Sequence, residues 1–182
     1  MVSKLSFCNN ILITGNPGVG KTSLAVLLAD ELTHKTGKEY KAINIGDLIH
    51  KNKLYDNWNK EFDVPEFNED RVIEHLEEQG ISNGGFIIDF HSGCFFPEDW
   101  FTLVILLRCN NTDLYDRLKL RGYNDKKIME NIECEIMEVT ADEVKESYST
   151  ERILELKNEK VEDMQNNINV IVNTYLSMLN NQ

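Results

Sequence analysis

The chain lacks any apolar run near the ~20 residues that cross a bilayer, so we expect no membrane-spanning segment. Its first residues, MVSKLSFCNN, carry only scattered apolar side chains and lack the apolar core of a secretory signal. Cysteine is scarce, and Cys8, Cys94, Cys109 and Cys134 form no C-x-x-C pair. This spacing argues against a zinc site or a disulfide framework and favours reduced, structural thiols. These absences predict an intracellular protein.

Positive charge is also in short supply. The 182 residues carry 19 Lys and Arg against 31 Asp and Glu, which gives a formal net charge of -12 at pH 7. This charge repels a nucleic-acid backbone at long range, so we expect no direct binding to DNA, whereas a basic protein partner is electrostatically easier. The length suits one well-packed core, and repeats and linkers are absent. We therefore predict a single domain over residues 1–182, and we expect a monomer.

Five apolar runs predict the strands of an α/β fold, at residues 10–14, 41–45, 85–90, 102–107 and 152–156. Most of these runs are continuous, as expected of parallel strands covered on both faces. Apolar residues at helical spacing lie between the runs and after the last one. We expect helices from Thr22 to Gly37, from Asn68 to about Gly80 and from Val161 to Leu179. The alternation predicts a layered fold with a parallel sheet.

Two further helices are expected between the fourth and fifth strands. Thr112 and Asp113 predict the N-terminal cap of the first of them, which carries Leu114 and Leu118. A four-residue series then predicts a single helix with its apolar side formed by Ile128, Ile132, Ile136 and Val139.

The stretch GNPGVGKT, residues 15–22, directly follows the first predicted strand and precedes the first predicted helix. It matches the pattern G-x-x-x-x-G-K-[ST] in the strand, turn and helix context that this pattern requires. Backbone N–H groups in such a turn form an anion-binding nest, and glycine leaves room for a phosphate. Lys21 is expected to reach the β- and γ-phosphates of ATP, and the Thr22 hydroxyl to hold Mg²⁺. The alternative is a tight turn with a surface lysine.

The strand at 85–90 ends near Asp89, where a P-loop enzyme needs a carboxylate close to Mg²⁺. The alternative for Asp89 is a cap on the next turn. His91, two residues further on, points to the same side of an extended chain. It could orient a water or accept a proton, and it could equally be a packing histidine.

Phosphoryl transfer needs cations aimed at the developing charge. Arg117 and Arg121 stand four residues apart on a predicted helix, and Arg121 begins a loop that could move as a lid. Arg108, at the end of the fourth strand, lies near the edge where ligands of open α/β sheets bind. An ordinary surface ion pair, such as Asp113 with Arg117, is the alternative.

Residues 46–67 form a long, polar and aromatic connection between the second strand and the following helix. A connection of this length in a compact domain is usually functional or mobile. We interpret it as the receiver of the second substrate, with a surface insert as the alternative.

Five stretches together resemble the small nuclear adenylate kinase family, the coilin-interacting nuclear ATPase type, whose members also assemble the small ribosomal subunit: GNPGVGKT, INIGDL, NEDRV, IIDFHSGCFFPEDW and YDRLKLRGYNDKKIMENIECEIM. The resemblance implies a three-layer P-loop NTPase fold, adenylate-kinase-like, with a five-stranded parallel sheet. It also implies a nucleoside-monophosphate arm at about 44–67 and a short lid at about 120–130.

The reaction implied is the reversible transfer from MgATP to AMP that gives two ADP, with ATPase activity alongside. The partner implied is a basic small-subunit ribosomal protein, and the location is nuclear and cytoplasmic. The catalytic residues implied are Lys21, Asp89, His91, Arg117 and Arg121, with Thr22 and Asp89 on the metal. ATP binding falls to Gly15, Gly18, Val19, Gly20, Lys21, Thr22, Ser23 and Arg121, and AMP binding to Gly46, Asp47, His50 and Lys51.

Two positions depart from the family pattern. Cys94 stands where the family usually has an aspartate, which weakens the case for a second carboxylate near the metal. His50 and Lys51 stand where related kinases place an arginine on the AMP phosphate, and lysine lacks the bidentate fork of arginine. Two other hypotheses stay open. One is a nucleotide-switched assembly ATPase whose kinase turnover is incidental, motivated by His91, the acidic charge and the family likeness. The other is a kinase for another small acceptor such as a sugar acid.

Overall fold

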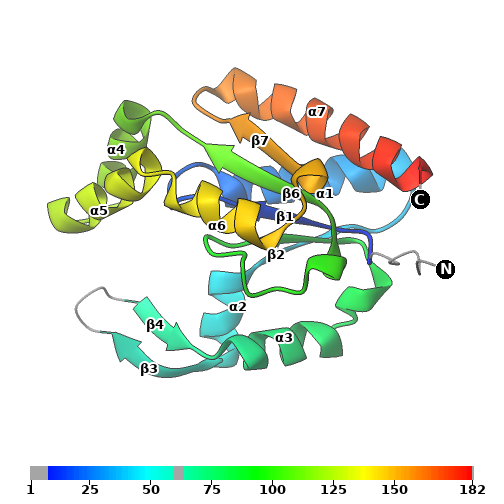
Figure 1. Ribbon diagram of the computed structural model, residues 1–182, viewed down its shortest axis with the longest axis horizontal. Helices are drawn as coiled ribbons and strands as arrows, with labels where there is room; N and C mark the ends of the chain where they lie inside the picture. The colour runs from blue at the N-terminus through cyan, green and yellow to red at the C-terminus, as the bar shows by residue number, and fades with distance from the viewer. Residues whose placement is uncertain (1–7, 60–63, 182) are drawn as a thin grey trace.

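The computed structural model describes residues 8–59 and 64–181 and centres on a five-stranded sheet (Figure 1). The strand order is β2-β5-β1-β6-β7, and each neighbouring pair is parallel. The strands are β1 (Asn10–Thr14), β2 (Lys41–Asn44), β5 (Phe86–Asp89), β6 (Phe101–Arg108) and β7 (Ile153–Lys157). The predicted parallel sheet and its five strands are thus confirmed.

Helices cover both faces of the sheet, and alternation along β1 shows why. Ile11 and Ile13 pack into a core shared with α1 (Lys21–Thr36) and α7 (Val161–Asn180). Leu12, between them, packs into a second core with α2 (Ile45–Asn52), α3 (Glu69–Glu78) and α6 (Val139–Ser147). Successive strand residues point to opposite faces, so one strand supplies both cores and the fold has three layers (Figure 1).

Two helix predictions were wrong in detail. Asn110, not Thr112 or Asp113, caps α4 (Asn111–Leu120), because its side chain accepts the backbone N–H of Asp113. The series expected to form one helix is split between α5 (Asp125–Ile136) and α6. Glu138, with φ +55°, interrupts the helical path, so Val139 begins a new helix.

The segment between β2 and α3 is more regular than a polar connection suggests. It contains α2 and an antiparallel hairpin of β3 (Tyr55–Asn59) and β4 (Val64–Phe67). Lys53, with φ +55°, ends α2 and turns the chain toward the hairpin. Figure 1 shows α2, the hairpin and α3 together below the sheet. Short 3₁₀ turns complete the fold at Ile81–Asn83, Glu98–Trp100 and Thr150–Arg152.

Among the helices formed by residues 8–59 and 64–181, none combines the length and the apolar character that a membrane crossing requires.

The carboxyl ends of the parallel strands bring the polar residues to one edge of the sheet. Asp89 on β5 is in register with Ile13 on β1 and with Asn44 on β2. The loop after β1 therefore starts beside the last residues of β2 and β5. This is the edge at which open α/β sheets bind their ligands.

Candidate active site

The P-loop, residues 15–22, joins β1 to α1 through backbone conformations that few residues other than glycine adopt. Gly15 has φ +138° and Gly20 has φ +103°. A Cβ on Gly15 would collide with the Leu107 carbonyl, and one on Gly20 would collide with the Asn158 side chain. Both dihedral angle and neighbours therefore require glycine here, and the main chain stays bare for a phosphate.

Lys21, in the first turn of α1, is only 9% exposed. Its Nζ donates to the carbonyl of Gly15 at 2.8 Å and to that of Asn16 at 3.0 Å. Burial lowers the pKa of Lys21 to about 8; Asp89 opposes this shift and Arg121 adds to it. A phosphate is a stronger acceptor than two neutral carbonyls, so the ammonium is poised to exchange them for an anion.

Three polar side chains meet beside the P-loop, from the start of α1 and the ends of β2 and β5. Thr22 Oγ1 donates to Asp89 Oδ2 at 2.5 Å, and Asn44 Nδ2 donates to the same oxygen at 2.6 Å. Asp89 is 1% exposed, so this carboxylate is buried and hydrogen-bonded. The strand register described above is what places Asn44 and Asp89 side by side.

The oxygens of Thr22 and Asp89 fit a magnesium ion. Hydroxyl and carboxylate oxygens are the hard donors that Mg²⁺ prefers, and Mg²⁺ usually keeps several waters and binds substrate phosphates. In the part of the chain that the structure describes, His, Cys, Asp and Glu form no cluster of three or more that could hold a metal. Two protein oxygens beside a phosphate site match this ion, and Thr22 and Asp89 would hold it together with ATP.

His91 lies two residues beyond β5 and is an exposed residue. The ring packs against Phe90, with ring centroids 4.3 Å apart. Desolvation by the surrounding protein and the charge of Lys21 lower the pKa of His91 to about 4, against the opposing effect of Asp89. The imidazole is therefore neutral near pH 7 and can accept a proton.

Arg117 and Arg121 do not point to one group. Arg121 is the C-cap of α4 and lines the larger cavity defined below. Arg117 donates to three backbone carbonyls, those of Gly18 at 3.4 Å, Asn158 at 2.9 Å and Glu159 at 2.6 Å. Arg117 thus ties the P-loop to the loop that follows β7, and Arg121 is the arginine that faces the cavity.

Arg108 supports the P-loop from behind. Its Nε donates to Glu135 at 2.5 Å, and Nη1 lies 3.2 Å from Glu138 and 3.4 Å from Glu155. Glu135, 5% exposed, also accepts the Asn16 side chain at 2.5 Å. The interpretation of Arg108 as a ligand-facing cation is therefore replaced by an ion-pair network, buried at Glu135 and exposed at Glu138 and Glu155, that anchors the loop.

Two adjoining cavities open beside the P-loop, and both are lined by Thr22, Asn44 and Asp89. The larger cavity, ≈ 470 Å³, is completed by Pro17, Lys21, Gly46, Ile49, His50, Phe67, Phe90, His91, Arg121 and Tyr123. The smaller cavity, ≈ 360 Å³, is completed by Ala25, Val26, Ala42, Ile43, Asp47, Leu48, Lys51 and Asn52.

The residues predicted to bind AMP are divided between these cavities. Gly46 and His50 line the larger cavity, whereas Asp47 and Lys51 line the smaller one. The division follows the helical period, because residues four apart share a face of α2. The larger cavity is lined both by cations at the P-loop and by an aromatic wall, the name used below for Phe67, Phe90 and Tyr123.

The other predicted residues lie close by in different settings. Val19 is fully buried in the core below the P-loop, and Gly18 packs against Leu114 and Leu118 of α4. Ser23 is exposed on α1 and lines neither cavity. Cys94, the departure from the family pattern, is exposed with its Sγ 3.5 Å from the Ser92 hydroxyl.

Three asparagines of the site were not predicted from the sequence. Asn44 links Asp89 to α2, Asn16 links the P-loop to Glu135, and Asn158 Nδ2 donates to the Val19 carbonyl at 2.7 Å. The one available signal was the position of Asn44, because asparagine is a preferred N-cap residue and it lies between a predicted strand and Gly46-Asp47. The partners of Asn16 and Asn158 are more than a hundred residues away, and no local pattern encodes them.

The chain is similar to known proteins over most of its length. A family model described as an AAA domain matches residues 11–138. The chain is 43% identical over 162 residues to the adenylate kinase isoenzyme 6 homolog of Dictyostelium discoideum, covering 89% of each chain. It is 37% identical to the homolog of Drosophila melanogaster, covering 91% of each, and 38% identical to the homolog FAP7 of Saccharomyces cerevisiae, covering 90% of this chain and 80% of that one.

Solved structures show the same fold at low sequence identity. Shikimate kinase from Bacteroides thetaiotaomicron is 16% identical, with a TM-score of 0.59 over 90% of this chain and 95% of that one. A gluconokinase from Sinorhizobium meliloti is 15% identical, with a TM-score of 0.52 over 96% of this chain and 93% of that one. These likenesses establish the P-loop kinase fold and nothing about the acceptor.

Proposed function

The chain belongs to the family of adenylate kinase isoenzyme 6 homologs, and from this premise we propose that it transfers the γ-phosphoryl group of MgATP reversibly to AMP, giving two ADP. The family and the fold make it an adenylate-kinase-like P-loop nucleotide kinase. The choice of AMP as acceptor, the roles of individual residues and the biological setting belong to the proposal.

One observation carries the proposal: a single cavity joins the phosphate side to the acceptor side. Lys21 and Arg121 supply cations, while Phe67, Phe90 and Tyr123 supply aromatic surface. A phosphate monoester attached to a flat base needs both kinds of surface, one for its charge and one for its ring. A small sugar acid would leave the aromatic wall without a partner, which favours a nucleotide acceptor.

The proposed chemistry is positioning and charge stabilisation. Lys21 would leave the loop carbonyls for the transferring phosphoryl group, and Arg121 would approach that group from the end of α4. Mg²⁺, when held by Thr22 and Asp89, would neutralise phosphate charge. His50 and Gly46 on α2 would face the acceptor. Arg117 would keep the P-loop in place from outside the cavity.

Closure of the site is part of the proposal. The described part of the arm, residues 44–59 and 64–67, would move over the acceptor. The lid at 120–130, which contains the α4–α5 turn, would carry Arg121 over the phosphates. Gly122, with φ +77° and open space around it, suits a hinge in that turn.

A second activity, hydrolysis of ATP, is favoured by His91. A neutral imidazole that lines the same cavity as Lys21 and Asp89 can orient a water or take its proton. We propose ATPase activity alongside transfer and, as the alternative biological role, a nucleotide-switched assembly factor with kinase turnover incidental.

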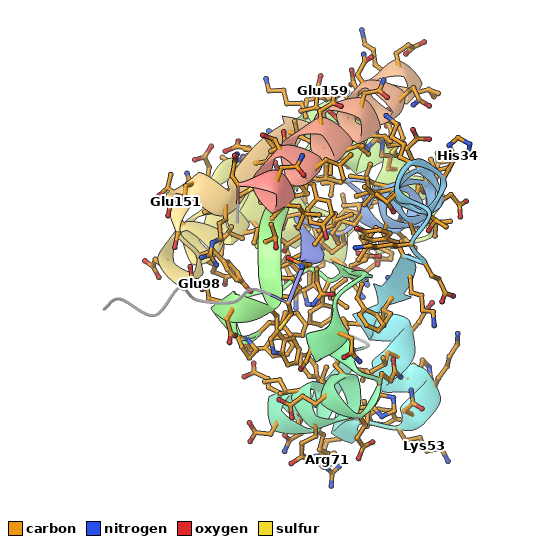
Figure 2. All side chains as sticks on the ribbon, turned by 90° about the vertical axis from the view of Figure 1, so that its right-hand side faces the viewer. His34, Lys53, Arg71, Glu98, Glu151 and Glu159 are labelled. Atoms are coloured by element: carbon orange, nitrogen blue, oxygen red, sulfur yellow. The ribbon has the colours of Figure 1, made fainter. Side chains whose placement is uncertain are left out.

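The setting that we propose is assembly of the small ribosomal subunit, in the nucleus and the cytoplasm, with a basic ribosomal protein as partner. The net charge of -12 supports a basic partner. Figure 2 shows Glu98, Glu151 and Glu159 on the outer surface, on the side of the molecule away from Lys53 and Arg71.

The test is to supply γ-labelled MgATP with AMP, other nucleoside monophosphates, shikimate or gluconate, and to follow the label. We expect label in ADP with AMP present, and slow release of labelled phosphate without it. Label transferred to a sugar acid, or ATP cleavage that ignores AMP, would overturn the kinase assignment. A basic ribosomal protein that fails to associate at low salt would overturn the assembly role.

A further inference from the structure

Asn44 occupies the junction between the phosphate side and the acceptor side of the site. It is the last residue of β2 and the N-cap of α2, with φ -85° and ψ 115°. Register with Asp89 places it beside the site carboxylate. It also lines both cavities. The side-chain amide of asparagine carries a hydrogen-bond donor and an acceptor on one planar group.

Both ends of this side-chain amide are hydrogen-bonded. Nδ2 donates to Asp89 Oδ2 at 2.6 Å and lies 3.3 Å from Thr22 Oγ1. Oδ1 accepts the backbone N–H of Asp47 at 2.9 Å, in the first turn of α2. Because the amide is planar and rigid, Nδ2 and Oδ1 move together. A rotation that keeps Nδ2 on a moving Asp89 carboxylate therefore also shifts Oδ1, which accepts the Asp47 N–H.

Comparable caps elsewhere in the chain show that the link to the site is particular to Asn44. Asn68 caps α3 by accepting the N–H of Arg71 at 3.3 Å, and it lines neither cavity. Asn124 caps α5 by accepting the N–H of Lys127. Asn110 caps α4 and its Nδ2 donates to the carboxylate of Asp113, which belongs to the capped helix itself. Capping alone therefore needs no carboxylate partner, and what sets Asn44 apart is that its partner, Asp89, lies on a different element, the strand β5.

We propose that Asn44 is a positioning residue that couples magnesium-nucleotide binding at the P-loop to the orientation of α2, an inference that rests on the proposed function. A magnesium nucleotide that engages the Thr22 hydroxyl and the Asp89 carboxylate competes with the bonds between these groups and Asn44. The amide then rearranges, and the first turn of α2, which carries Gly46 and leads to His50, follows it. Binding of the magnesium nucleotide at the P-loop thereby aligns α2 on the acceptor side.

The direct test follows the Asp47 amide by ¹⁵N NMR. The probe is a non-hydrolysable ATP analogue, added first with Mg²⁺ and then with a chelator in place of Mg²⁺. In the wild type we expect the Asp47 resonance to shift with the magnesium complex and to return most of the way when the metal is removed. An Asp47 resonance that does not respond to the magnesium complex would overturn the proposal without any variant.

Two variants separate coupling from capping. Asn44→Ser and Asn44→Asp both keep a strong N-cap, but neither offers the amide donor to Asp89. We expect the metal-dependent Asp47 shift to fall at least ~5-fold in both, whereas the matched cap variant Asn68→Ser keeps it. A shift of wild-type size in either Asn44 variant would overturn the proposal.

Calorimetry gives an independent readout. In the wild type we expect the magnesium complex of the analogue to tighten AMP binding by ~5-fold or more, and in Asn44→Ser we expect this ratio to approach one. An unchanged ratio in Asn44→Ser would contradict the coupling. AMP that fails to bind the wild type at all would instead defeat the proposed function, and the Asp47 measurement, which needs no AMP, would still decide the role of Asn44.

Discussion

The two sides of the active site differ in how far their residues are buried and hydrogen-bonded. On the donor side, formed by the P-loop with Asp89 behind it, Lys21 is 9% exposed and Asp89 1% exposed, and each is hydrogen-bonded within the protein. On the acceptor side, formed by α2 and the β3–β4 hairpin, the predicted binding residues Gly46, Asp47, His50 and Lys51 are all exposed.

The sheet explains this contrast. The donor side lies at the carboxyl ends of β1 and β5, which are inner strands with parallel neighbours on both sides. The acceptor side rests on an eight-residue helix and a two-stranded hairpin, structures of low independent stability. The P-loop side is thus built on the most stable part of the fold, whereas the proposed acceptor side is built on less stable elements, and Asn44 lies between the two.

Removal of the donor-side cation should have the largest effect. We expect Lys21→Ala to lower the rate of ADP formation from ATP and AMP by about 10²–10³, as the loss of a preorganised charge does elsewhere. Lys35→Ala is the control, because Lys35 makes a half-exposed ion pair with Glu31 on the same helix. A Lys21→Ala enzyme within a few-fold of the wild type would show that the donor side is not built around this ammonium.

A Cβ inside the P-loop should be the next most damaging change. Gly20→Ala combines φ +103° with a collision against Asn158, and we expect it to lower the free energy of unfolding by ~1–3 kcal/mol and to weaken ATP binding. Gly122→Ala, with φ +77° and nothing within 4 Å, carries the strain without the collision. Urea unfolding should therefore give a lower free energy of unfolding for Gly20→Ala than for Gly122→Ala. Equal losses of unfolding free energy in the two variants would contradict the packing argument.

Protonation gives a smaller effect that is specific to the donor side. The pKa of His91 is about 4 in the folded protein against 6.5 for the ordinary side chain. Between these two pH values His91 is protonated in the unfolded chain and neutral in the folded protein. Protonation then favours the unfolded state, so the free energy of unfolding is highest above pH 6.5 and falls as the pH falls toward 4. We expect His91→Gln to flatten the pH dependence of unfolding in that window.

The control for this measurement is His34→Gln. His34 is exposed in the last turn of α1 (Figure 2), whereas the site residues Lys21 and Thr22 lie in its first turn. If His34→Gln changes the slope between pH 4 and pH 6.5 as much as His91→Gln does, the depressed pKa is not the cause.

Single changes on the acceptor side should have the smallest effects. Lys51 is exposed and lines the smaller cavity, so Lys51→Ala should raise KM for AMP by less than ~5-fold and leave kcat unchanged, as expected of a solvent-screened charge. His50→Ala, in the larger cavity, should raise KM further. The reverse order in steady-state kinetics would mean that AMP occupies the smaller cavity.

The same contrast decides how much the sequence could predict. Continuous apolar runs indicated all five parallel strands, and glycine spacing indicated the P-loop, because both depend on local chemistry. Arg117 binds the loop after β7, whereas Arg121 lines the larger cavity. The four-residue spacing of the two arginines carries no information about that loop, so it could not separate their roles. The break between α5 and α6 depends on one residue, Glu138, in a backbone conformation that its type does not announce.

The acceptor side was least predictable for a related reason. Residues 46–67 lack long apolar periodicity, so α2 and the hairpin left only a weak signal beyond an asparagine at the helix start. The role of Asn44 itself arises from the register of β2 with β5, which is a property of the assembled sheet.

The most direct test of the account is calorimetry with a bisubstrate analogue in which two adenosines are joined by five phosphates, titrated in Mg²⁺. One shared cavity predicts that one molecule binds per chain and that it excludes both ATP and AMP. Two molecules bound per chain, or AMP that still binds when the analogue is saturating, would contradict it.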